Sequence, residues 1–185
     1  MKIAATANPR ERRAELGQFL TASSVAEFMA SMFGPLPQTV RLLDAGAGAG
    51  ALTLAFVSRC CEKRDDVRAI DATLYELDGE ILEALATTMR ECERRCSDAG
   101  IRFAVTIHSD DFIQEMSGRL AGDLFGTMPP AFDAAIANPP YRKISTDSAE
   151  RRALRSVGVE TSNLYTGFIA LIQRCLLYTS PSPRD

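Results

Sequence analysis

The chain has 185 residues, of which 24% are charged and 46% are hydrophobic, and its formal net charge is −3. This length suits about one globular domain. The sequence has no apolar run long enough to span a membrane and no secretory signal at its N-terminus, so we expect a cytoplasmic protein without membrane association.

Residues 40–60 predict a short apolar strand, a glycine-rich turn and an amphipathic helix. Glycines in such a turn permit positive φ and let a ligand approach the backbone closely, and the N-terminus of the following helix would face that ligand. An ordinary tight turn between a strand and a helix is the alternative. The candidate ligand-binding residues are Asp44, Gly46, Gly48 and Gly50.

A second strand is predicted over residues 69–76 and is followed by a helix. An acidic residue at the end of the second strand of a nucleotide-binding α/β fold commonly accepts hydrogen bonds from ribose hydroxyls. Glu76 is the better placed carboxylate for that role, and Asp78 is expected to cap the N-terminus of the next helix. Simple solvation at a strand end is the alternative for both residues.

A third strand, over residues 103–107, leads to Asp110, Asp111 and Phe112. A carboxylate at this place can accept a hydrogen bond from an adenine amine, and the phenylalanine ring can lie against the base. We assign the acceptor role to Asp111 and expect Asp110 to be a solvated turn residue.

The fourth predicted strand, residues 133–137, ends at Asn138, Pro139, Pro140 and Tyr141. Proline has no N–H and a fixed φ, so the backbone carbonyls here are held without a competing donor, and the residue before a proline is confined to an extended conformation. An amide oxygen, a prolyl carbonyl and a flat ring together suit a planar amino group. The sequence therefore predicts a site for methyl transfer to such a nitrogen.

A run of basic residues follows this motif, at Arg142, Lys143, Arg151, Arg152 and Arg155. Two interpretations remain open: contacts with nucleic-acid phosphates, which would offset the overall negative charge, or a solvated loop.

Five cysteines occur, at positions 60, 61, 92, 96 and 175. Cys92 and Cys96 share a helix face, but the single histidine, His108, lies elsewhere in the sequence. We expect reduced thiols of a cytosolic protein and no metal site, with a zinc site as the weaker alternative.

Along the chain, the glycine turn comes first, then Glu76, then Asp111 and Phe112, and last the Asn-Pro-Pro-Tyr motif. This order resembles the gamma arrangement of adenine-specific DNA methyltransferases, which are found in restriction-modification systems. That family opens with a segment similar to residues 17–21, Gly-Gln-Phe-Leu-Thr, placed before the glycine turn. Residues 163–168 also resemble its Asn-Leu-Tyr-x-x-Phe helix, here with Asn163, Leu164, Tyr165 and Phe168. The resemblance covers most of residues 10–174.

The resemblance implies a Rossmann-like class I methyltransferase fold, with a parallel sheet that has helices on both faces. It implies methyl transfer from S-adenosylmethionine to the N6 amine of an adenine flipped out of double-stranded DNA, with a fused or partner restriction nuclease as a further expectation. Asn138, Pro139, Pro140 and Tyr141 would form the target-base site. The cofactor residues would be Gly17, Phe19, Thr21, Asp44, Gly46, Gly48, Gly50, Glu76, Asp111 and Phe112.

Two alternatives to this function stay open. Enzymes that methylate a protein glutamine amide or a guanine of ribosomal RNA also use an Asn-Pro-Pro-(Tyr/Phe) motif, although the Gly-Gln-Phe-Leu-Thr segment favours DNA adenine. The other alternative is a fragment that binds cofactor or DNA without turnover.

The last residues, 175–185, read CLLYTSPSPRD and resemble a translated sequencing adapter. Pro181 and Pro183 break the helical periodicity that precedes them. We therefore expect a partial catalytic domain over residues 1–174, truncated after the fourth core strand and its following helix, and a non-native tail over residues 175–185. On this interpretation the chain alone is expected to show little or no turnover.

Overall fold

The computed structural model describes residues 21–63, 66–122 and 131–177. Four strands form one parallel sheet in the order β3-β2-β1-β4. They are β1 (Thr39–Ala45), β2 (Ala69–Tyr75), β3 (Arg102–His108) and β4 (Ala134–Ala135). All four lie where the apolar runs of the sequence predict them, which confirms the expected parallel sheet.

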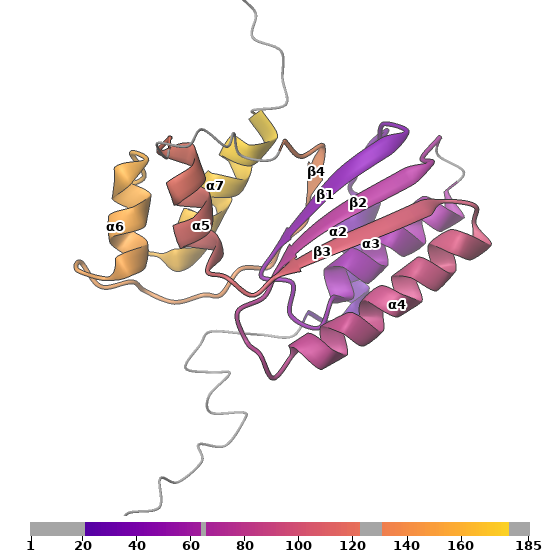
Figure 1. The fold of residues 1–185 in the computed structure, drawn as a ribbon, viewed down its shortest axis with the longest axis horizontal. Coiled ribbons are helices and arrows are strands. Elements are labelled where there is room, and N and C mark those ends of the chain that lie inside the picture. Colours follow the sequence, from indigo (N-terminus) through magenta and orange to yellow (C-terminus); the bar gives the residue numbers. More distant parts are fainter. Residues whose placement is uncertain (1–20, 64–65, 123–130, 178–185) are drawn as a thin grey trace, which may run out of the picture.

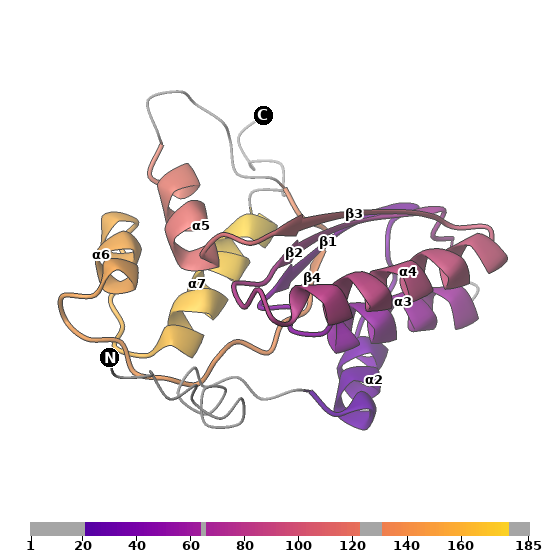
Figure 2. The same ribbon diagram turned by 60° about the horizontal axis from the view of Figure 1, so that its bottom comes forward.

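Helices lie on both faces of this sheet (Figures 1 and 2). One face is covered by α2 (Ser23–Ser31), α3 (Ala51–Glu62) and α4 (Leu82–Asp98). The other group of helices is α5 (Phe112–Leu120), α6 (Ala149–Ser156) and α7 (Leu164–Leu177). Within the described residues, none of these helices is long and apolar enough to cross a membrane.

Alternate residues of β1 are buried in two separate apolar cores, because successive side chains of a strand point to opposite faces of the sheet. Val40 and Leu42 are fully buried against α2, α3 and α4. Leu43 and Ala45 are fully buried on the opposite face, against α5 and α7. The central strand is therefore buried on both sides, which is typical of parallel sheets.

β4 is a very short edge strand, and an ion pair holds its beginning against β1. The carboxylate of Asp133 accepts hydrogen bonds from the backbone N–H of Arg41 at 2.9 Å and from two nitrogens of its guanidinium group at 2.7 and 2.9 Å. These hydrogen bonds and the guanidinium charge lower the pKa of Asp133. Ile136 N–H then donates to the Leu43 carbonyl at 2.9 Å, which aligns the chain that leads into Asn138.

Candidate functional site

The loops after β1 and β4 leave the same carboxyl edge of the sheet, from two strands that pair in parallel. The chain proceeds from β1 to β2 to β3 in one direction, and then crosses back to place β4 on the other side of β1. Ligands of open α/β sheets bind in the crevice at such a switch point. The glycine loop follows β1 and residues 138–141 follow β4, so the prediction that both loops lie at the carboxyl ends of the strands is confirmed. The structure adds that these two strands are neighbours.

The glycine loop has a backbone conformation that favours glycine at three positions. Gly46, Gly48 and Gly50 have φ of 81°, 56° and 85°. The loop is tied to the neighbouring strand, because the N–H groups of Gly46 and Ala47 both donate to the Tyr75 carbonyl at 2.9 Å. A side chain at Gly50 would also lie only 2.9 Å from Met89 Cε, whereas at Gly48 it would meet open space. The open side of the loop can therefore take a ligand.

Asp44 is a fully buried carboxylate immediately before this loop. Its Oδ2 accepts a hydrogen bond from the Thr53 hydroxyl at 2.7 Å, while its Oδ1 is buried without a hydrogen-bond partner among the described residues. Burial raises the pKa of Asp44 to about 7, and the nearby charge of Glu76 adds to this effect. A buried acceptor without a donor is costly, so Oδ1 is suited to a cationic or N–H donor from a ligand.

Glu76 is buried at the end of β2 and joins this strand to the glycine loop. Its two carboxylate oxygens accept from the N–H groups of Gly48 and Asp78, both at 2.7 Å. Each oxygen keeps a further lone pair for a ligand hydroxyl. The expectation that Asp78 caps the next helix is wrong: α4 begins at Leu82, and Asp78 instead accepts from the Glu80 N–H within the turn before it, at 3.0 Å.

Asp111 and Phe112 lie at the start of α5, near the end of β3. Asp111 is the N-cap of this helix and accepts from the Gln114 N–H at 3.0 Å. The Phe112 ring is 3% exposed; it stacks on Phe168 at a centroid distance of 5.1 Å and meets Tyr75 edge to face at 5.2 Å. Phe112 is therefore mainly part of the apolar core in this structure and leaves little of its ring for a ligand.

The Asn138–Tyr141 loop follows β4 at the carboxyl edge of the sheet. Pro139 is buried, Asn138 and Pro140 are half-buried, and Tyr141 is 57% exposed. The Asn138 side-chain nitrogen donates to the Thr21 hydroxyl at 3.2 Å, which connects the end of the N-terminal segment to this loop. Gly17 and Phe19 of that segment lie outside the described residues.

Tyr165, which had no assigned role in the sequence, stacks on Tyr141. An isolated antiparallel bridge between Lys143 and Asn163 brings the two loops together. The Leu164 N–H donates to the Arg142 carbonyl at 2.9 Å. The Asn-Leu-Tyr motif in the sequence could have pointed to Tyr165. Asn163 caps α7 by accepting a hydrogen bond from the Tyr165 N–H at 2.9 Å, which fixes the start of the helix that carries this ring.

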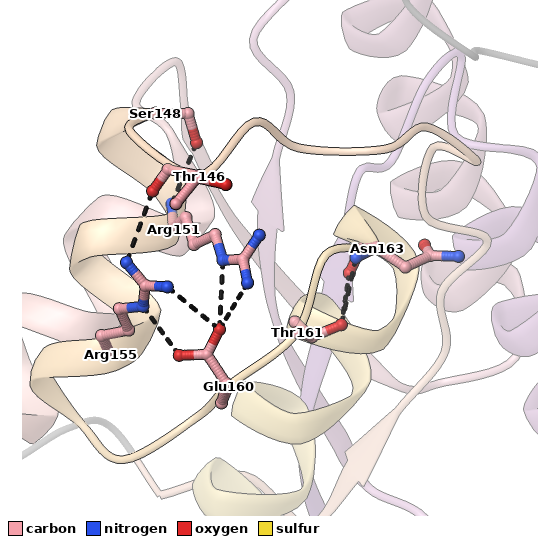
Figure 3. A network of polar contacts seen from close by, with 7 residues as sticks. All are labelled: Thr146, Ser148, Arg151, Arg155, Glu160, Thr161 and Asn163. Atoms are coloured by element: carbon pink, nitrogen blue, oxygen red, sulfur yellow. Dashed lines mark hydrogen bonds and ion pairs between the residues drawn. The ribbon is translucent and has the colours of Figure 1, made fainter.

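Arg151 and Arg155 of α6 both form ion pairs with Glu160 (Figure 3). The Glu160 carboxylate accepts from Arg155 Nε at 2.7 Å and from Arg151 Nη2 at 2.6 Å. Hydrogen bonds from Arg155 and Arg151 hold the pKa of Glu160 at about 2. Arg142 is likewise paired with Glu150, at 2.8 Å. The carboxylates of Glu150 and Glu160 thus neutralise part of the positive charge of the basic run. Contacts between these basic residues and DNA phosphates stay a prediction.

Comparison with solved structures places this fold in a known class. A class I S-adenosylmethionine-dependent methyltransferase structure from Listeria monocytogenes matches 83% of the chain, with a TM-score of 0.53 and 17% identity, over 41% of that chain. A type I restriction-modification methyltransferase subunit from Streptococcus thermophilus matches 85% of the chain, with a TM-score of 0.53 and 22% identity, over 32% of that chain. The protein has the Rossmann-like fold of class I methyltransferases, as expected.

The family follows from sequence comparison. The model of the family described as N-6 DNA Methylase matches residues 5–184, and the chain belongs to this family. It is 37% identical over 159 residues to the type II methyltransferase M.PstI of Providencia stuartii, covering 86% of this chain and 30% of that protein. It is also 37% identical over 174 residues to M.BsuBI of Bacillus subtilis, covering 90% of this chain and 32% of that protein. The chain thus spans about a third of the length of these relatives.

Proposed function

We propose that the gene product containing this chain methylates the exocyclic N6 amine of adenine in DNA, with S-adenosylmethionine as the methyl donor. The observation that carries this proposal is that the glycine loop and the Asn138–Tyr141 loop follow two neighbouring parallel strands at the switch point of the sheet. Family membership and the two type II methyltransferase relatives support the same reaction. A DNA substrate also supports the cytoplasmic location expected from the sequence.

The residues on the β1 and β2 side fit S-adenosylmethionine. The unpartnered Oδ1 of Asp44 suits the ammonium group of its methionine part, and the Glu76 carboxylate suits its ribose hydroxyls. The open side of Gly48 allows close approach to the backbone, and Gly46 precedes it in the same loop. Gly17, Phe19, Thr21, Gly50 and Asp111 complete the proposed set, together with the small part of the Phe112 ring that the apolar core leaves uncovered. When bound, the cofactor supplies an electrophilic methyl group on a positively charged sulfur.

The Asn138–Tyr141 loop is proposed to hold the target amine. The nitrogen lone pair of this amine is delocalised into the ring, which makes it a poor nucleophile. Asn138 Oδ1 and the Pro139 carbonyl would accept its two hydrogens and favour a tetrahedral nitrogen, whose lone pair is then available. Pro139 and Pro140 fix the backbone of the loop. These groups therefore position and polarise the amine, and neither of them acts as a nucleophile.

Tyr141 is proposed to receive the base. An amine inside a duplex cannot be reached by a site of this kind, so the adenine must be flipped out of the helix and stacked. The exposed ring of Tyr141 offers a surface for that purpose. Lys143 and the arginines of α6 lie nearby in the chain and are candidates for phosphate contacts. A restriction nuclease, fused or separate, is the proposed biological partner.

The proposal is tested by measuring transfer of tritium-labelled methyl groups to duplex DNA by the gene product that contains this chain. We expect N6-methyladenine in the digested DNA. Asn138→Ala should lower kcat by about 10²–10³-fold, the usual effect of losing a preorganised group in the transition state, and leave the cofactor Kd within about twofold. Labelled protein or RNA in place of DNA would support the alternative methyltransferases, and near-normal kcat in the variant would refute the role of Asn138.

A further inference from the structure

Thr21 and Asn138 are 117 residues apart in the sequence, yet their side chains are joined by a hydrogen bond of 3.2 Å. Thr21 precedes Ala22, the N-cap of α2, whose carbonyl accepts from the N–H groups of Val25 and Ala26 at 3.0 Å. Ala26 and Ala30 then pack α2 into the core at 1% exposure each. The Thr21 hydroxyl is thus attached to a fixed element of the fold.

The side-chain amide of Asn138 has two chemically opposite ends: an oxygen that accepts and a nitrogen that donates. A target amine presents N–H donors, so only the oxygen end can hold it, and a flipped amide would set a donor against a donor. In this structure, Nδ2 is the end that faces Thr21. Among the described residues this is the one hydrogen bond of the Asn138 side chain, and in this arrangement the Thr21 hydroxyl holds the Nδ2 end and leaves Oδ1 free for the target amine.

We propose that Thr21 is a positioning residue that acts through Asn138: its hydroxyl accepts from Nδ2 and so turns Oδ1 toward the target amine. This role rests on the proposed function and is additional to the cofactor contact that the family resemblance implies for Thr21. It makes the N-terminal segment part of the base site as well as of the cofactor site. On this proposal, the Thr21 hydroxyl belongs to both the base site and the cofactor site.

The hydrogen bond can be tested without any turnover, by nitrogen-15 NMR of the side-chain amides in the 185-residue chain. The sequence contains three asparagines, at positions 8, 138 and 163, and Asn138→Asp identifies the relevant pair of signals. Thr21→Val, which keeps the shape and removes the hydroxyl, should shift the Asn138 amide signals and speed their hydrogen exchange about tenfold. Thr21→Ser should restore both, and the Asn163 signals serve as an internal control.

The consequence for catalysis is measured on the gene product that contains this chain. At saturating DNA and cofactor, we expect Thr21→Val to lower kcat at least tenfold, beyond any loss of cofactor affinity that the same substitution causes, and Thr21→Ser to recover most of the rate. If the Asn138 signals do not respond to Thr21→Val, or if that variant weakens cofactor binding and leaves kcat unchanged, the proposed role is refuted. If the signals respond but the wild-type protein methylates no DNA, the orienting contact stands and the proposed function fails.

Discussion

The ring of Tyr165 lies almost parallel to the ring of Tyr141, with centroids 4.8 Å apart and 16° between the planes. Tyr165 therefore covers one face of Tyr141, while 57% of Tyr141 stays exposed. We expect a flipped base to stack on the free face, with Tyr165 holding the ring in place from behind.

The stack predicts different effects at its two positions. Tyr141→Ala should weaken capture of the base by about 1–3 kcal/mol, the usual value of a lost base–aromatic stack. Tyr165→Ala should have a smaller effect in the same direction, and Tyr141→Phe and Tyr165→Phe should be mild because the ring faces matter most. The fluorescence of 2-aminopurine at the target position of a DNA duplex measures capture. An unchanged signal in Tyr141→Ala would count against stacking at this ring.

Glu76→Ala should weaken cofactor binding by about 1.5–3 kcal/mol, the usual cost of losing a hydrogen bond to a charged group. It should also lower the melting temperature, because the N–H groups of Gly48 and Asp78 lose their acceptor. Calorimetric titration with S-adenosylmethionine, performed well below the melting temperature, separates the two effects. Asp78→Ala is the control and should bind normally, because its carboxylate accepts a hydrogen bond from the Glu80 N–H within the local turn. Unchanged affinity in Glu76→Ala would remove Glu76 from the cofactor site.

Asp44 predicts a pH dependence of stability in the absence of cofactor. Its pKa is raised to about 7 in the folded state from about 3.9 when unfolded, so the protonated carboxyl favours the folded state. That stabilisation is fully present below about pH 4 and is lost as the pH rises toward 7. It amounts to at most about 4 kcal/mol, at 1.36 kcal/mol per pKa unit.

Asp44→Asn removes this titration, so the variant should gain stability relative to the wild type as the pH rises from 4 to 7. Urea unfolding of both proteins at several pH values measures the difference. Parallel pH profiles would show that Asp44 stays ionised in the folded protein.

The glycine loop offers a matched pair of substitutions. Gly50→Ala combines positive φ with a Cβ position 2.9 Å from Met89 Cε and 3.0 Å from Leu85 Cδ1. Gly48→Ala has positive φ but no atom within 4 Å, so its cost should be about 1–2 kcal/mol, from the left-handed conformation alone. Gly50→Ala should cost about 1–3 kcal/mol more, because of overpacking. Chemical denaturation tests this order, and equal losses would contradict it.

The strands and the two loops could be predicted from the sequence because they depend on local signals. Apolar runs bounded by glycine or proline mark β1 and β4, and parallel pairing brings their carboxyl ends to one edge. The helix cap assigned to Asp78 could not be corrected without the structure, because Glu76 folds back to bind the Asp78 N–H. The same holds for the Thr21–Asn138 contact and for the burial of Phe112 against Phe168, which depend on packing between distant segments.

The two-residue length of β4 has a consequence for how activity is lost. Elements with few backbone pairings open locally at a lower free energy than the whole domain. If β4 separates from β1, the Asn138–Tyr141 loop leaves the crevice, while the glycine loop keeps its ties to Tyr75 and Glu76 on the other side of β1. If the proposed function holds, mild denaturant should therefore produce a protein that still binds S-adenosylmethionine but no longer presents acceptors to the base, so that methyl transfer is lost before the domain unfolds.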